Sequence, residues 1–162
     1  MSTYYKIVSD GTVFTYAYNI NPYCQIPSGS VFTAQQPQTQ NEKNVYCIKK
    51  PIPVLHFCDN AFDTMLWYCY NMGGFDESAL TFYEIQPLTP VVKEKCCDDG
   101  GLYQCGANQI KIIRPIDKYE MFKRALNEFR QNPKAKIELY PNLQMPKIIS
   151  DWTHHQQSKY VY

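Results

Sequence analysis

The sequence predicts an α+β fold, a mainly antiparallel sheet of about five to seven strands with two helices packed on it. Three observations favour this class. Short runs of β-branched and aromatic residues recur between turn signals, which is typical of strands. Two longer segments carry apolar residues at helical spacing. The chain also contains 14 tyrosines, and tyrosine favours half-buried sheet surfaces.

The predicted strands follow one another along the chain, separated by turns. An Asp-Gly pair indicates a hairpin between residues 4–8 and 12–18. Further strands are expected over residues 31–33, 44–48, 52–58, 80–86, 89–95, 103–105, 109–113 and 136–140. In the segment 109–113, apolar and polar residues alternate, so one face of that strand is expected to be solvated. The Arg114-Pro115 pair is expected to end it.

The most clearly specified unit is a buried strand followed by a helix, within residues 51–70. Pro53 lacks an N–H, which places the strand at a sheet edge or makes Pro53 its first residue. Asp59 or Asn60 is expected to cap the helix, and a glycine pair to end it. One buried helical stripe is predicted: Phe62, Met65, Leu66, Cys69 and Tyr70.

The second helix is predicted over residues 118–131, with Asp117 as its cap and an Asn-Pro pair at its end. Its apolar stripe consists of Phe122, Ala125, Leu126 and Phe129. A chain of this length fits one domain, which we place over residues 1–149. Residues 150–162 are expected to form an irregular tail, in which Trp152 packs against the domain or a partner.

Composition argues against several classes of function. The 16 Lys+Arg are balanced by 15 Asp+Glu, so the basic excess of a general nucleic-acid binder is missing. No apolar run approaches the roughly 20 residues that span a bilayer, and no signal-peptide pattern is present. We therefore expect a cytoplasmic protein, with no membrane association. Frequent Lys, Asn, Tyr and Ile are typical of AT-rich genomes, which suggests a viral source and a location in the host cytoplasm or the virion.

The seven cysteines are an odd number and come without an export signal, so reduced thiols are expected. A zinc site would draw on three of them and an acidic neighbour: Cys96, Cys97 and Cys105 with Asp98 or Asp99. However, structural zinc sites usually show C-x2-C pairs and four ligands. Here the pair is adjacent, and a fourth sulfur would have to come from Cys24 or Cys47. We therefore predict no metal and no cofactor.

Several motifs occur in a characteristic order. A Tyr-Lys hairpin opens the chain, L-H-F-C precedes a helix ending in W-Y-x-Y, and F-Y-E-I-Q-P-L-T-P-V-V and N-Q-I-K-I-I-R-P-I follow. This order resembles a family of small phage and bacterial proteins grouped as a domain of unknown function, over residues 54–116. Where that family has G-F-H-x-C, this chain has Val54-Leu55 before His56. The resemblance implies a shared fold rather than an activity.

His56 and Cys58 are the first candidates for chemistry. A cysteine nucleophile needs a base close to its thiolate. Residues i and i+2 of a strand share a face, but their side chains are about 7 Å apart, too far for a direct hydrogen bond. We therefore favour a hydrogen-bonded core histidine beside a buried cysteine.

Glu84 is the second candidate. Strand alternation places Glu84 on the same face as Phe82, and a carboxylate beside aromatic rings is a position where a catalytic acid has a perturbed pKa. Similarity to small ADP-ribosyltransferase-like folds would make Lys6, His56 and Glu84 the successive functional positions. Those folds carry Arg or His at the first position, where this chain has Lys. The structural alternative is a solvent-facing or salt-bridged strand carboxylate.

These features together predict a non-catalytic interaction module that binds a protein partner, of the kind found among viral or phage accessory and virion-associated proteins. The alternative is a small ADP-ribosyltransferase-like enzyme that uses NAD, with His56 and Glu84 as catalytic residues. One observable feature separates the two. In the enzyme, His56 and Glu84 line a common cleft, whereas scattered positions favour the binding module.

Overall fold

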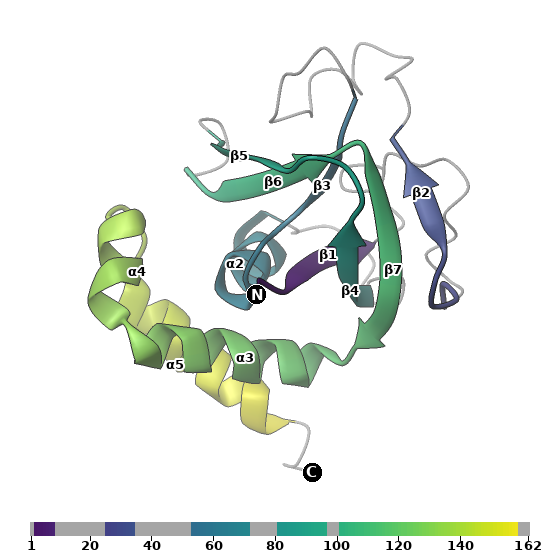
Figure 1. The fold of residues 1–162 in the computed structure, drawn as a ribbon. Helices are drawn as coiled ribbons and strands as arrows, with labels where there is room; N and C mark the ends of the chain where they lie inside the picture. The colour runs from purple at the N-terminus through teal and green to yellow at the C-terminus, as the bar shows by residue number, and fades with distance from the viewer. Residues whose placement is uncertain (1, 9–24, 35–52, 72–80, 97–100, 159–162) are drawn as a thin grey trace.

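A computed structural model describes residues 2–8, 25–34, 53–71, 81–96 and 101–158 of the chain. Within these ranges the elements (Figure 1) are β1 Tyr4–Val8, β2 Val31–Thr33, β3 Leu55–Phe57, α2 Ala61–Asn71, β4 Thr81–Pro87, β5 Val92–Lys95, β6 Tyr103–Ala107, β7 Gln109–Ile116, α3 Lys118–Gln131, α4 Pro133–Leu139 and α5 Met145–Ser158. The α+β class is confirmed. The prediction of two helices is wrong, since the described ranges alone contain four. The predicted strands at 12–18 and 44–48 lie outside these ranges.

The strands form two antiparallel sheets, not the single sheet predicted. Sheet A has the order β1-β4-β7-β2, and sheet B has the order β3-β6-β5. The sheets meet where the backbones of Tyr5 and Cys58 exchange two hydrogen bonds of 2.9 Å. They are also joined by the chain, which turns from β6 into β7 at Asn108. The Asn108 side chain donates to Pro53 O (2.9 Å) and its carbonyl accepts from Ala34 N (2.8 Å), which holds this corner.

The two faces of sheet A contribute to two separate cores. Along β4, alternation directs Phe82 toward the helices and Tyr83 toward sheet B. The helix-side core includes Tyr5, Ile7, Cys58, Phe62, Met65, Leu66, Phe82, Ile116, Phe122, Leu126 and Trp152. The inter-sheet core includes Val8, Leu55, Phe57, Tyr83, Ile85, Cys105, Ile110 and Ile112. In Figure 1, α3 and α5 cover the lower end of the molecule, and α2 lies between them and sheet B.

The predicted strand–helix unit is confirmed in outline. β3 is shorter than expected and lies at the edge of sheet B, which suits Pro53 just before it. In α2 the side chains of Phe62, Met65 and Leu66 are fully buried, whereas Cys69 is exposed. The side chain of Asn60 accepts a hydrogen bond from Asp63 N at 2.7 Å, which is the expected cap. The glycine pair expected to end the helix lies outside the described residues.

The prediction for α3 is correct at both ends, and Asp117 caps it by accepting from Tyr119 N at 3.0 Å. The predicted strand at 136–140 and the irregular tail are wrong, because these residues form α4 and most of α5. Pro133 and Pro146 lie in the first turns of these helices, where the missing N–H has no partner to lose. Trp152 is buried and packs edge-on against Phe62, with ring centroids 5.2 Å apart.

β7 continues past its predicted end to Ile116. Its register with β4 pairs Arg114 with Glu84 and then Ile112 with Ile85, so Ile113 is an extra residue. Such a β-bulge shifts the alternation by one, which lets Ile112 enter the inter-sheet core and Ile116 the helix-side core. A bulge also tolerates the proline at 115 that sequence analysis took as the end of the strand.

Candidate functional site

A groove of about 580 Å³ opens at one end of sheet A. Its lining comes from the residues before β1, from β4 and the connection to β5, and from the bulged residue of β7: Ser2, Thr3, Tyr4, Glu84, Ile85, Gln86, Pro87, Thr89, Val91 and Ile113. We call this the sheet-end groove. Ligand sites in proteins generally have volumes of about 300–1,000 Å³, so this groove is large enough for a short stretch of a partner chain.

The groove forms because the helices cover only part of the outer face of sheet A. Along β4, Phe82 is buried under the helices, Glu84 is half-buried and Gln86 is exposed. The β-bulge adds Ile113 to the lining beside Glu84. The pairing of β1 with β4 begins at Tyr4, so the two residues before it form a wall of the groove rather than part of the strand.

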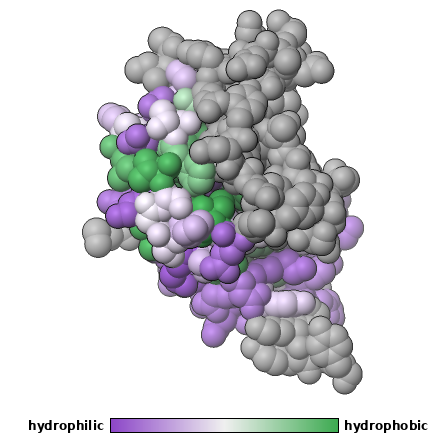
Figure 2. All heavy atoms as spheres, turned by 90° about the vertical axis from the view of Figure 1, so that its right-hand side faces the viewer, coloured by the Kyte–Doolittle hydropathy of each residue, from purple (hydrophilic) through white to green (hydrophobic). Residues whose placement is uncertain are grey.

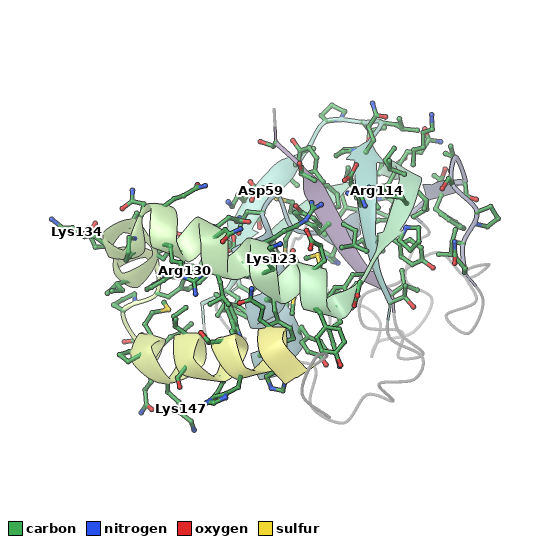
Figure 3. All side chains as sticks on the ribbon, turned by 90° about the horizontal axis from the view of Figure 1, so that it is seen from below. Asp59, Arg114, Lys123, Arg130, Lys134 and Lys147 are labelled. Carbon is green, nitrogen blue, oxygen red and sulfur yellow. The ribbon has the colours of Figure 1, made fainter. Side chains whose placement is uncertain are left out.

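Glu84 is the only charged residue among the described residues that line the sheet-end groove. Its Oε1 accepts a hydrogen bond from Arg114 Nη2 at 3.2 Å, and the side chains of Glu84 and Arg114 are 24% and 48% exposed. Figure 3 shows Arg114 on β7, apart from Lys123 and Arg130 on α3. Glu84 therefore shares its face with Phe82, as predicted, and has the salt bridge that the structural interpretation expects.

His56 lies in a different hollow. This small cavity, of about 10 Å³, has room for about one water molecule. It lies between α2 and the strands and is lined by Tyr5, Ile7, His56, Phe57, Cys58, Thr64, Trp67 and Gln104. His56 is 2% exposed and shares the cavity with Cys58, as strand spacing predicts. Burial raises the pKa of the Cys58 thiol well above its ordinary value, which is the opposite of what a nucleophile needs.

Lys6 is fully buried beside this region, and its Nζ donates to His56 O at 2.7 Å. Burial lowers the pKa of the Lys6 amine to about 7. The structure thus brings Lys6 and His56 together, whereas Glu84 lines the sheet-end groove and neither hollow contains both His56 and Glu84. Within the described residues, His56 and Glu84 therefore line separate hollows.

A buried polar junction, which sequence analysis missed, joins α2 to the C-terminal helices. The carboxylate of Glu128 accepts from Ala61 N (2.8 Å) and Phe62 N (3.3 Å) at the start of α2. The carboxylate of Asp63 accepts from the Tyr140 hydroxyl at 2.5 Å. Burial raises the pKa of both carboxyl groups. Glu128 thus ties α3 to the start of α2, and Asp63 ties α2 to the end of α4, so the junction holds these helices together.

The candidate zinc ligands do not converge. Four cysteines are free thiols within the described ranges: Cys58, Cys69, Cys96 and Cys105. Cys96 lies in the helix-side core and Cys105 in the inter-sheet core. Nowhere in the described part of the chain do three His, Cys, Asp or Glu side chains gather in a way suited to a metal ion. The remaining zinc candidates, Cys24, Cys47 and residues 97–99, lie outside that part.

No protein-family model, curated protein or solved structure shows significant similarity to this chain. Across the described ranges, every helix is too short or too polar to cross a bilayer.

Proposed function

We propose that this chain is a non-catalytic interaction module that binds a segment of a protein partner in the sheet-end groove. The supporting observation is the groove itself, an open depression of about 580 Å³ lined by aliphatic, aromatic and uncharged polar side chains with one carboxylate. A mixed lining of this kind suits a polypeptide, which presents apolar side chains and backbone polar groups together. A viral or phage accessory protein is the class in which we place it.

Exposed apolar residues in and beside the groove also favour the binding of a protein partner. Leu88 and Val91, in the connection between β4 and β5, are 42% and 38% exposed. Figure 2 views the molecule from the side of β2 and β7, and apolar surface gathers there at the level of sheet A, above the hydrophilic surface of the helices. Contiguous apolar surface with a polar border is characteristic of interaction sites.

The positions of the reactive groups also favour binding over catalysis. His56 and Cys58 line a cavity that has room for about one water molecule, so a substrate such as NAD does not fit beside them, and Lys6 is fully buried nearby on β1. Glu84 does face an open groove, but the described lining of that groove provides no second titratable group other than Tyr4. A transferase mechanism would need further groups converging on the same point.

The proposal is tested by affinity capture from the native source followed by mass spectrometry, with two variants. Val91→Asp introduces a charge in the lining of the groove, and the partner should be lost because an apolar contact is replaced by a solvated carboxylate. Val31→Asp is the matched control, since Val31 is an exposed valine on β2 that does not line the groove. A partner retained by Val91→Asp, or lost equally in both variants, would contradict binding in the groove.

A further inference from the structure

We propose that the segment bound in the sheet-end groove is an extended stretch of chain that presents a basic side chain, arginine or lysine, to Glu84 between aliphatic neighbours. This inference rests on the proposed function and adds the chemistry of the ligand. It follows from the charge of the lining, from the bonding capacity of Glu84, and from the length of the groove.

The charge of the groove lining favours a ligand with a positively charged side chain. Of the ten lining residues, Glu84 alone is charged, and the other polar members are Ser2, Thr3, Tyr4, Gln86 and Thr89. A ligand with an acidic side chain at this point would place two carboxylates together, which costs binding free energy. A polyanion such as a nucleic acid would meet the same repulsion at Glu84. Two cations of β7 lie beside the lining without being part of it: Arg114, which Glu84 engages, and Lys111, which is paired with Gln86. A basic side chain is the complementary partner.

Glu84 retains the capacity to bind this side chain. The contact with Arg114 joins one guanidinium nitrogen to Oε1, and a carboxylate has about four lone-pair positions on its two oxygens. A second cation therefore fits at Oε2 without removing Arg114. If Arg114 is displaced instead, the cost is small, because partly exposed ion pairs contribute little to stability. Arg114, which is itself half-exposed, then returns to solvent.

The dimensions and apolar walls fix the rest of the ligand. From Glu84 to Pro87 the groove follows three residue steps of β4, about 10 Å at 3.3 Å per step, so about three residues of an extended ligand fit. Ile113 provides an apolar contact next to Glu84, and Val91 provides another from the β4–β5 connection. A tripeptide unit with a basic residue between two aliphatic residues offers an apolar side chain to these walls in either direction along β4.

The experiment compares three peptides by NMR titration of isotope-labelled protein. Acetyl-Val-Arg-Val-amide is the probe, acetyl-Val-citrulline-Val-amide is its uncharged isostere, and acetyl-Val-Glu-Val-amide is the acidic counterpart. We expect saturable shifts of the amide signals of Thr3, Gln86 and Ile113 with the arginine peptide. The citrulline peptide should bind about tenfold more weakly, because it lacks the charge-assisted bond to Glu84. The glutamate peptide should give no saturable shift at these amides.

Two variants complete the test. Glu84→Gln should abolish the difference between the arginine and citrulline peptides, whereas Glu120→Gln, which removes another ion-paired glutamate on α3, should preserve it. Equal groove binding of the arginine and citrulline peptides by the wild type would overturn the inference about charge and leave the groove as a binding site. No shift at the groove with the arginine peptide would overturn the inference, while capture of a partner that depends on Val91 would still support the proposed function.

Discussion

Lys6 shows how strongly the position of one residue in the fold determines its chemistry. Strand alternation in β1 turns Lys6 to the face opposite Tyr5 and Ile7, away from the helix-side core, and it is fully buried there beside β3. An isolated buried ammonium group is costly, so burial lowers the pKa of its amine to about 7, and His56 O accepts its hydrogen bond. The free energy of unfolding therefore depends on pH through the protonation of this amine.

The pH dependence of stability tests this role. The pKa of the Lys6 amine is about 7 in the folded protein and ordinarily 10.5, so between these pH values the unfolded chain binds the additional proton. The free energy of unfolding should therefore rise with pH, by at most about 1.4 kcal/mol per pH unit from about pH 7 to about pH 8.5. Lys6→Met should flatten this rise and be at least as stable as the wild type at about pH 7.

Urea denaturation of both proteins at several pH values in this range measures the effect. Cysteine thiols of the unfolded chain, such as Cys58, begin to titrate in this range and act in the opposite direction, but both proteins contain them, so the difference between the two curves isolates the effect of Lys6. Parallel curves for wild type and Lys6→Met would show that Lys6 is protonated in the folded protein.

Glu84→Gln distinguishes a structural glutamate from a catalytic one. The ion pair with Arg114 is partly exposed, so its loss should lower the free energy of unfolding by no more than about 1 kcal/mol. We expect no NAD hydrolysis by either protein, measured as release of nicotinamide. If the wild type turns over NAD and the variant loses this activity by orders of magnitude, the enzyme reading replaces the binding module.

Among the elements, α2 is held by both polar and apolar contacts. Glu128, on α3, accepts hydrogen bonds from the first two amides of α2. The hydroxyl of Tyr140, which follows α4, donates to Asp63 in the first turn of α2. The free N–H groups at the start of a helix need such acceptors. These bonds therefore cap the first turn of α2, and they also fix the positions of the C-terminal helices relative to α2.

Tyr140→Phe should weaken this junction. The substitution removes the hydroxyl that donates to the buried Asp63, and the free energy of unfolding should fall by about 1–3 kcal/mol. Chemical denaturation at neutral pH measures the change, with Tyr119→Phe on the partly exposed side of α3 as the control. An equal or smaller loss for Tyr140→Phe than for Tyr119→Phe would mean that the hydrogen bond does not hold α4 and α5 in place.

Leu66→Ala tests the apolar side of the same helix. Leu66 is fully buried in the helix-side core, and replacing a buried leucine by alanine removes apolar contacts and leaves a cavity. The free energy of unfolding should fall by about 2–5 kcal/mol, as determined by denaturant titration. A fall of less than about 1 kcal/mol would show that this face of α2 is not part of a packed core.

In the whole molecule, the two cores shield cysteines from reagents. Cys58, Cys96 and Cys105 are buried, and burial raises the pKa of the Cys58 thiol. In the native protein these three should react slowly with a thiol reagent at about pH 8, because neither the thiolate nor its access is available. After unfolding without reductant, we expect most of the seven cysteines to titrate as free thiols. Peptide mass mapping that finds three disulfides would contradict this.

Much of the secondary structure follows from local patterns in the sequence. The bounds of α3 were predictable because its cap, its apolar stripe and its terminating Asn-Pro pair all lie within the segment itself. The same reasoning failed for α4 and α5, because residues 136–140 were expected to form a strand and residues 150–162 an irregular tail, whereas Pro133 and Pro146 lie in the first turns of two further helices. A proline disfavours the helical conformation of the residue before it. Whether a helix begins at the proline depends on the residues that follow it.

The sequence alone determined the α+β class, the burial of Phe62, Met65 and Leu66 in α2, and the face that Glu84 shares with Phe82, because these depend on the periods of individual helices and strands. Only the tertiary structure decided the two sheets, the bulge at Ile113 and the sheet-end groove. The groove combines residues 2–4, 84–91 and 113, which strand pairing brings together from distant parts of the chain. Strand register, and how much of sheet A the helices cover, depend on the packing of the whole chain, so no local sequence pattern predicts them.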